Sequence, residues 1–277
     1  MPSYLVTGAN RGLGVSDEPI HSTPAILTPR QYGFVKYLAK NPENTIIGIV
    51  RDKTKADKSV AADGLNNVTM IQADIADYKS LLAAREKVAQ ITGGSLDYLI
   101  NNAALIDTTT QGKGLDDFED EPEVLDKGLI DSFNVNVVAV IHTINIFLPL
   151  IKKGSAKKVV LISSGMADPD LVNAGVFADG PYTISKAAAN MAIFKYNAKY
   201  KKEGILFFAI SPGVVATWPE GTPEPPVIQV FRQRNPGWKG PLTPLESAEA
   251  CLKVIHEFNA EENGGSFVSH WGNKQWL

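Results

Sequence analysis

Cysteine is almost absent from this chain of 277 residues, in which Cys251 is the only one. A single thiol cannot form an internal disulfide, and it cannot supply a metal site built from several cysteines. The histidines add no metal-ligand spacing, and we interpret His142, His256 and His270 as structural. Cys251 itself is expected to be a small buried apolar residue on a helix.

An excess of positive charge is also lacking. The chain carries 27 Lys and Arg against 30 Asp and Glu, which gives a net charge of −3. Nucleic-acid-binding domains instead carry a basic stripe or have a high pI, so we expect no nucleic-acid partner. We also find no charged segment followed by an apolar one at the start, and no apolar run of membrane-spanning length. These absences predict a cytoplasmic protein that has no membrane partner.

The sequence does contain a regular alternation of short apolar runs and helical patterns. The runs expected to be strands are residues 4–7, 45–50, 68–73, 96–101, 157–162, 205–210 and 266–269. Helical spacing of apolar residues marks 34–39, 79–91, 129–151, 183–200 and 245–258. Strands that alternate with helices form βαβ units with parallel strands. The sequence therefore predicts one α/β domain over residues 1–277, a Rossmann-type doubly wound parallel sheet of about seven strands with helices on both faces.

A glycine-rich turn directly follows the first expected strand, with the sequence Thr7-Gly8-Ala9-Asn10-Arg11-Gly12-Leu13-Gly14. Glycines let the backbone amides approach a pyrophosphate, and ligands bind at this edge of an α/β sheet. The second expected strand ends at Arg51, where an arginine suits the 2′-phosphate of NADP(H), and Arg11 is a second cation nearby. The alternatives are an ordinary glycine turn and a solvated arginine.

Residues 15–31 interrupt the motif, because Pro19, Pro24 and Pro29 forbid the helix that should follow Gly14. Removing these 17 residues leaves 20 positions between Gly14 and Arg51, close to the usual distance of about 20 from fingerprint to ribose-reading residue. The ends of the segment can be encoded as splice sites. We hypothesise that it is an unspliced intron; the alternative is a genuine surface loop. If present, it is expected to weaken cofactor binding.

Tyr182 and Lys186 open the helical pattern 183–200 and share one helix face at i, i+4. A nearby ammonium lowers the pKa of a phenol and makes it a usable acid and base. This spacing alone is common by chance. It gains weight from Ser164, which ends a buried strand at the same sheet edge, and from Asn136 within an apolar helix. A buried amide needs partners, although Asn136 could also be a satisfied core residue.

The ordered set of motifs resembles the short-chain dehydrogenase/reductase family along nearly the whole chain. The motifs are Thr7-Gly8-x-x-x-Gly12-x-Gly14, Asp74, Asn101-Asn102-Ala103, Asn136, Ser164, Tyr182-x-x-x-Lys186 and Pro212-Gly213-x-Val215-x-Thr217. The chain departs from the family at Ala104, where glycine is usual, and at the segment 15–31.

This resemblance implies that Tyr182 is the acid and base, and that Lys186 binds the nicotinamide ribose and lowers the pKa of Tyr182. It implies that Ser164 orients the carbonyl and that Asn136 holds a water for proton relay. The cofactor-binding residues that it implies, besides Tyr182 and Lys186, are Thr7, Gly8, Asn10, Arg11, Gly12, Leu13, Gly14, Arg51, Asp74, Ile75, Asn102, Ala103, Pro212, Gly213, Val215 and Thr217.

Within the family, residues 9–14 and the ending 267–277 resemble C-factor or sniffer-type carbonyl reductases. They are especially similar to fungal norsolorinic acid ketoreductase-like proteins of secondary metabolism, which reduce a ketone on an aromatic polyketide. Residues 213–244 are then expected to form a substrate lid. Its Trp218, Phe231 and Trp238 could stack on a flat substrate or simply pack the lid.

The leading hypothesis is an NADPH-dependent reductase of a hydrophobic or aromatic ketone. One alternative is a non-catalytic protein that senses NADP(H) on the same fold, although a sensor needs neither Tyr182 nor Lys186. Another is an epimerase or dehydratase of the extended group, for which the chain is short. The resemblance also suggests a homo-oligomer formed through the helices at 129–151 and 183–200.

Overall fold

The computed structural model describes residues 1–9, 32–218 and 223–277. Its centre is one sheet of seven strands in the order β3-β2-β1-β4-β5-β6-β7, in which every neighbouring pair is parallel. The strands are β1 Ser3–Thr7, β2 Thr45–Val50, β3 Val68–Gln72, β4 Tyr98–Asn101, β5 Lys158–Ile162, β6 Leu206–Ser211 and β7 Phe267–Ser269. The order reverses between β1 and β4, as in a doubly wound sheet. The predicted fold class and the seven strands are confirmed.

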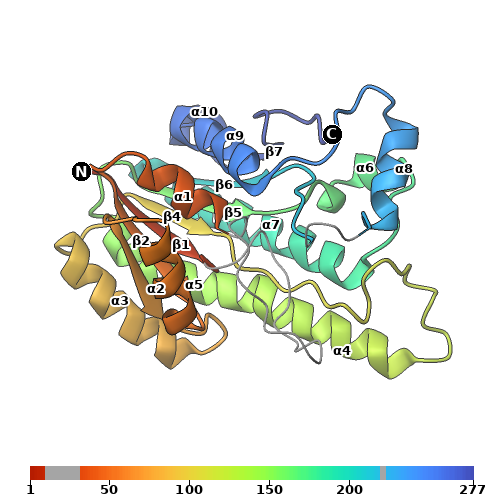
Figure 1. Ribbon diagram of the computed structural model, residues 1–277, viewed down its shortest axis with the longest axis horizontal. Coiled ribbons are helices and arrows are strands. Elements are labelled where there is room, and N and C mark those ends of the chain that lie inside the picture. The colour runs from red at the N-terminus through yellow and green to blue at the C-terminus, as the bar shows by residue number, and fades with distance from the viewer. Residues whose placement is uncertain (10–31, 219–222) are drawn as a thin grey trace.

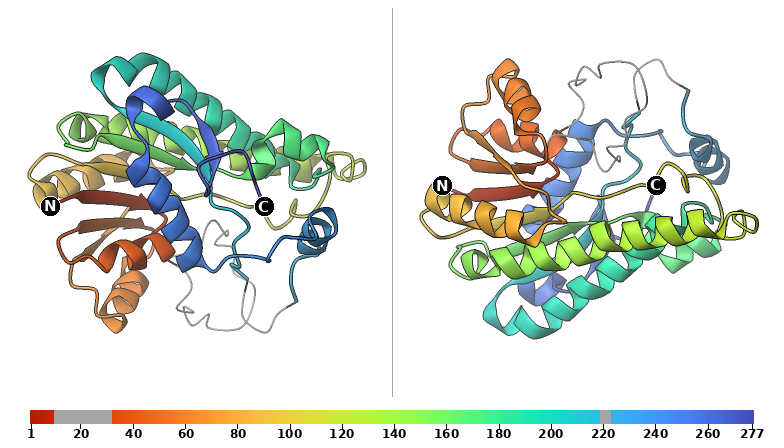
Figure 2. Two further views of the ribbon diagram at one scale, coloured as in Figure 1. Left: turned by 90° about the horizontal axis from the view of Figure 1, so that it is seen from above. Right: turned by 90° about the horizontal axis from the view of Figure 1, so that it is seen from below.

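Helices cover both faces of the sheet, as Figure 2 shows. One face packs against α1 Gly33–Ala39, α2 Lys53–Ala62 and α9 Pro244–Glu257. The other packs against α3 Tyr78–Thr92, α5 Ala139–Ile151 and α7 Gly180–Tyr200. Both faces of the sheet are therefore shielded from solvent. This explains why the strands are continuous apolar runs, in which apolar and polar residues do not alternate.

Helices α1 and α9 approach each other closely at Gly33. A Cβ atom at this position would lie 2.1 Å from the carbonyl oxygen of Pro244, so only glycine fits. Helix α9 begins there with a capping box, in which the Thr243 hydroxyl accepts from the Glu246 amide and the Glu246 carboxylate accepts from the Thr243 amide.

The apolar helix predicted at 129–151 begins earlier than expected. It starts as α4 Pro122–Phe133, passes through a π-helical turn at Asn134–Val138 and continues as α5. Proline at its first turn suits a helix start, because that position needs no amide donor. The start at 129 was wrong because charged residues surround the half-buried Val124 and Leu125 of the first turns and obscure their helical spacing.

This continuous helix is long and apolar enough to cross a membrane by length and composition, with a mean hydropathy of 1.7 in its most apolar window. The expectation that no such run exists was therefore wrong. Within the fold, 61% of that window is buried. Its apolar side chains pack under the sheet beside α3, as those of a core helix do.

The carboxyl ends of the strands face the end of the molecule opposite the N-terminus, where Figure 1 shows α6, α8 and the C-terminus together. Helices α6 Pro169–Asn173 and α8 Pro226–Arg234 border a small apolar cluster of their own around Val176, Ile228 and Phe231. This second cluster stands apart from the two cores of the sheet, and it forms the walls of the candidate site.

Candidate active site

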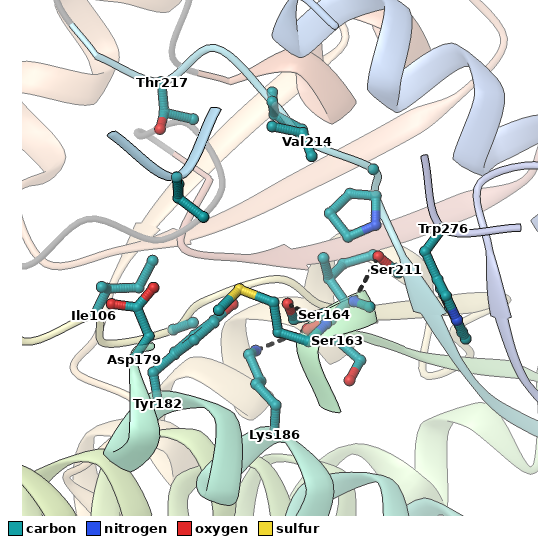
Figure 3. A pocket seen from close by; sticks show the side chains of 18 of the residues that line it. Ile106, Ser163, Ser164, Asp179, Tyr182, Lys186, Ser211, Val214, Thr217 and Trp276 are labelled. Atoms are coloured by element: carbon teal, nitrogen blue, oxygen red, sulfur yellow. Dashed lines mark hydrogen bonds between the residues drawn. The ribbon is translucent and has the colours of Figure 1, made fainter. Parts of the chain in front are cut away.

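A cavity at the carboxyl edge of the sheet brings the expected catalytic residues together. Ser164 follows β5, while Tyr182 and Lys186 come from the first turns of α7, and all three line the same cavity. Figure 3 shows the three side chains converging on this space, with Trp276 on the opposite side. The spacing of Tyr182 and Lys186 puts both on the helix face that points at the end of β5.

Lys186 is almost completely buried, with 1% of its surface exposed. Its ammonium donates a hydrogen bond of 2.8 Å to the carbonyl oxygen of Ile162, and it lies 5.7 Å from the centroid of the Tyr182 ring. Burial disfavours the charged form and lowers the pKa of Lys186 to about 7. Burial therefore makes the charged form of this lysine much less favoured near neutral pH than it is for a lysine in water.

The pKa of Tyr182 is raised above its ordinary value in the protein alone. Burial is the main cause, and the charge of Asp179 adds to it, whereas the nearby Ser164 hydroxyl lowers the pKa. The expectation that Lys186 lowers the Tyr182 pKa is not met here. The reason is that Lys186 is itself desolvated and gives up its charge near neutral pH, so it attracts a phenolate weakly.

Ser164 is positioned by the turn that follows β5. It caps the short helix η2 Gly165–Ala167, and its hydroxyl accepts from the Met166 amide at 3.3 Å. The Gly165 amide in turn donates to the Ser211 hydroxyl at 2.9 Å, which ties this turn to the end of β6. Ser164 is half-buried and lines the cavity, where its hydroxyl can reach a ligand.

Asn136 lies in the π-helical turn and is fully buried. Its side-chain oxygen accepts from the Leu105 amide at 2.7 Å, and its amide nitrogen donates to the Leu105 carbonyl and to the Ser185 hydroxyl, both at 2.9 Å. The side chain thus joins the chain after β4 to α7. It is a positioning group, and its amide hydrogens are already used, so the implied water contact is not made through them.

The turn after β1 is built for a close approach of backbone. Gly8 has φ of 63°, and a Cβ there would lie 2.9 Å from the Ala103 Cα. The Thr7 hydroxyl accepts from the amides of Asn102 and Ala103, while the Asn102 side chain donates to the carbonyls of Thr7 and Gly8. The buried Asn102 Oδ1 has no partner among the described residues, and it could accept from a ribose hydroxyl. These residues fit a bound dinucleotide.

The remaining expected cofactor residues form two groups. Arg51 and Asp74 are exposed directly after β2 and β3, and Ile75 is half-buried beside them. A second group lines the cavity after β6, namely Pro212, Gly213, Val215 and Thr217. Asn10, Arg11, Gly12, Leu13 and Gly14, together with the segment 15–31, lie outside the described residues.

The comparison with known sequences decides the family. A family model described as short chain dehydrogenase matches residues 32–222. The chain belongs to this family. The short-chain dehydrogenase/reductase AacuF of Aspergillus aculeatus is 46% identical over 286 aligned residues that cover 100% of both chains. The short chain dehydrogenase virK of Hypocrea virens is 43% identical with the same coverage.

Solved structures agree with this short-chain dehydrogenase in fold. The carbonyl reductase Sniffer of D. melanogaster superposes with a TM-score of 0.74 at 21% identity, and the match covers 99% of this chain and 98% of that one. An NADPH-bound carbonyl reductase from chicken fatty liver superposes with a TM-score of 0.71 at 26% identity, covering 98% and 97%. Family membership makes the chain an oxidoreductase.

The cavity of this short-chain dehydrogenase also contains residues that the sequence did not single out. Asp179 stands three residues before Tyr182, and Trp276 reaches the cavity from the C-terminal segment. Trp218 and Phe231 of the expected lid line the cavity, whereas Trp238 packs edge-on against Phe231 with ring centroids 6.0 Å apart. The described residues contain no group of His, Cys, Asp and Glu able to hold a metal.

Proposed function

We propose that this oxidoreductase reduces a ketone to a secondary alcohol with NADPH as hydride donor. The observation that carries the proposal is the convergence of Ser164, Tyr182 and Lys186 on one cavity at the carboxyl edge of the sheet. Much of the remaining cavity wall is apolar and includes Met166, Trp218 and other large side chains. We infer a hydrophobic substrate with a flat or aromatic body.

NADPH is supported by two solved relatives, one described as NADPH bound and one as a complex with NADP. Arg51 adds a cation at the end of β2, where the 2′-phosphate of NADP(H) is expected. The backbone turn at Gly8, the free oxygen of Asn102 and the segment at Gly213 would hold the nucleotide. When bound, it supplies the hydride.

The protein's own part is to orient the carbonyl and supply the proton. The Ser164 hydroxyl donates to the substrate oxygen and polarises the bond. As negative charge grows on that oxygen, the neighbouring Tyr182 phenol donates its proton. Its raised pKa keeps Tyr182 protonated at neutral pH, and an alkoxide is a far stronger base than a phenolate, so the transfer runs downhill. In its charged form, Lys186 offsets part of the charge of the phenolate left behind.

The test is to incubate the protein with NADPH and a panel of aromatic ketones while following the nicotinamide absorbance. We expect turnover by the natural chain and a loss of at least about 100-fold in the Tyr182→Phe variant, with NADPH binding unchanged. Thr183→Ala, at the next position on the same helix, serves as the matched control. NADPH binding without turnover on any ketone would favour a non-catalytic sensor instead. Full activity of Tyr182→Phe would refute the assignment of Tyr182 as the proton donor.

We also propose that the outer faces of α4 and α7 join two copies of the chain. These helices pack side by side and expose large apolar side chains, namely Ile130, Phe133, Ile184 and Met191. Such a patch favours self-association. Light scattering of the natural chain and of Phe133→Lys tests this: we expect a dimer that the charge converts to a monomer, and a natural chain that is already monomeric would refute it.

A further inference from the structure

Asp179 is an acidic side chain in the wall of an otherwise largely apolar cavity. It is the residue before α7, and it is the only aspartate or glutamate among the described residues that line the cavity. Figure 3 shows it beside Ile106 and Tyr182. The charge of Asp179 raises the pKa of Tyr182, so Asp179 is a close neighbour of the proton donor.

The backbone holds Asp179 in a fixed and unusual conformation. Its φ is 61° and its ψ is 41°, a left-handed geometry that residues other than glycine seldom adopt. The Asp179 amide donates to the Lys113 carbonyl at 3.0 Å, and its Oδ1 accepts from the Gly112 amide at 2.6 Å. These two hydrogen bonds hold Asp179 against the segment of chain that follows β4. Such backbone outliers persist where the surrounding structure supports them.

The second carboxylate oxygen, Oδ2, has no hydrogen-bond or ion-pair partner among the described residues. Burial raises the pKa of Asp179, which expresses the cost of holding its charge away from water. The same charge also raises the pKa of the neighbouring Tyr182. A hydrogen-bond donor brought by a ligand would relieve both penalties, because a half-buried carboxylate gains more from a donor than an exposed one does.

We propose that Asp179 selects the substrate by accepting a hydrogen bond through Oδ2 from a free hydroxyl group on the ketone. This inference rests on the proposed ketone reductase function and adds the substrate class: ketones that carry a phenolic, enolic or alcoholic hydroxyl within reach of the reacting carbonyl. A hydroxyl fits the cavity better than an ammonium group. Desolvating a cation among side chains such as Ile106 and Trp218 costs much more than desolvating a hydroxyl.

If Asp179 only held the chain in place, its replacement would affect all ketones equally. The chain offers a matched control for such a structural role. Asp117 binds the same stretch of chain in the same way, since its Oδ2 accepts from the Gly114 amide at 2.7 Å. Asp117 is exposed and does not line the cavity. Asp117→Asn therefore measures the effect of weakening a hydrogen bond to this stretch of chain, without any change in the cavity.

The experiment compares three ketones of one skeleton that carry a hydroxyl, a methoxy group or a hydrogen at the same position beside the carbonyl. The natural chain should reduce the hydroxyl compound with a kcat/KM about 10- to 100-fold above the hydrogen compound. In Asp179→Asn, the side-chain oxygen keeps the Gly112 bond and an NH2 group replaces Oδ2. Asparagine tolerates the left-handed backbone, so the variant should fold.

We expect Asp179→Asn to lower the ratio of kcat/KM on the hydroxyl compound to kcat/KM on the hydrogen compound by at least about 10-fold. Asp117→Asn should keep the natural ratio. Two results would overturn the proposal. One is a natural chain that reduces the hydroxyl and hydrogen compounds with equal kcat/KM, which needs no variant to measure. The other is a loss of kcat/KM in Asp179→Asn that is equal on all three ketones. If the natural chain reduces none of them and no other ketone, the proposed function fails instead, so the two failures are distinguishable.

Discussion

The ammonium of Lys274 binds the carboxylate of Asp168 at 2.9 Å, across 106 positions of the chain. Asp168 is buried, and it also caps α6 through the Asp170 amide. The pair fastens the C-terminal segment over the turn after β5. There the Trp276 ring lies against Gly165, where an added Cβ would meet the ring at 3.2 Å. The last residues of the chain thus become a wall of the active site.

Replacing Trp276 by Ala should therefore change substrate choice more than chemistry. We expect KM for a bulky aromatic ketone to rise about 10-fold, because an aromatic side chain in contact with ligand contributes about 1 kcal/mol or more. The KM for a small ketone should stay within about 2-fold. Steady-state kinetics on both ketones measure this. Trp271→Ala, an exposed tryptophan outside the cavity, is the control; an equal effect of the two variants would contradict the assignment.

Lys186→Met should abolish most activity and change how stability depends on pH. Burial lowers the folded-state pKa of Lys186 to about 7, from an ordinary value of 10.5. Between these values the unfolded chain binds more protons than the folded one, so the contribution of Lys186 to stability rises with pH. Urea unfolding from about pH 7 to 9.5, without nucleotide, should show the natural chain gaining stability relative to Lys186→Met. Parallel pH profiles for the two proteins would argue against a buried titrating lysine.

Asn136→Ala should destabilise the protein by about 2–4 kcal/mol, because it strands buried polar groups of Leu105 and Ser185. Equilibrium unfolding in urea gives this value. The matched control is Asn134→Ala, since Asn134 is exposed in the same π-helical turn. A loss of activity in Asn136→Ala without any loss of stability would instead indicate a direct catalytic role.

Arg51→Ala should weaken NADPH binding about 10-fold and leave NADH binding almost unchanged, because an arginine at the end of β2 recognises the 2′-phosphate alone. Fluorescence titration with both nucleotides measures the two dissociation constants. Lys53→Ala, which removes another cation two positions further on, is the control. An equal loss for NADPH and NADH would show that Arg51 does not read the phosphate.

Deleting residues 15–31 should strengthen NADPH binding by at least about 10-fold, or 1.4 kcal/mol. The match to the family model begins at Tyr32, directly after this segment, and the deletion restores the usual spacing between the glycine turn and Arg51. Titration of both forms with NADPH tests the binding. Sequencing of transcripts tests the intron hypothesis, which fails if the main product retains the segment. An unchanged or weaker affinity after the deletion would contradict the binding prediction.

The sequence by itself determined the sheet and pointed to the candidate catalytic side chains. Strands buried on both faces read as short apolar runs, and this pattern is local, so all seven were found within one or two residues at each end. The pairing of Tyr182 with Lys186 was equally readable, because helical geometry fixes neighbours at i, i+4. The π-helical turn was not predicted because no local pattern marks it, and the early start of α4 was missed because charged residues surround its apolar Val124 and Leu125.

Only the tertiary structure decided what surrounds these groups. Asp179 and Trp276 reach the cavity, and Lys274 pairs with Asp168 beside it, through long-range packing that spacing along the chain cannot encode. The pKa of Tyr182 was misjudged for the same reason. A nearby lysine lowers the pKa of a phenol when both are hydrated, but here burial opposes the charge on both side chains, and burial is a property of the folded protein as a whole.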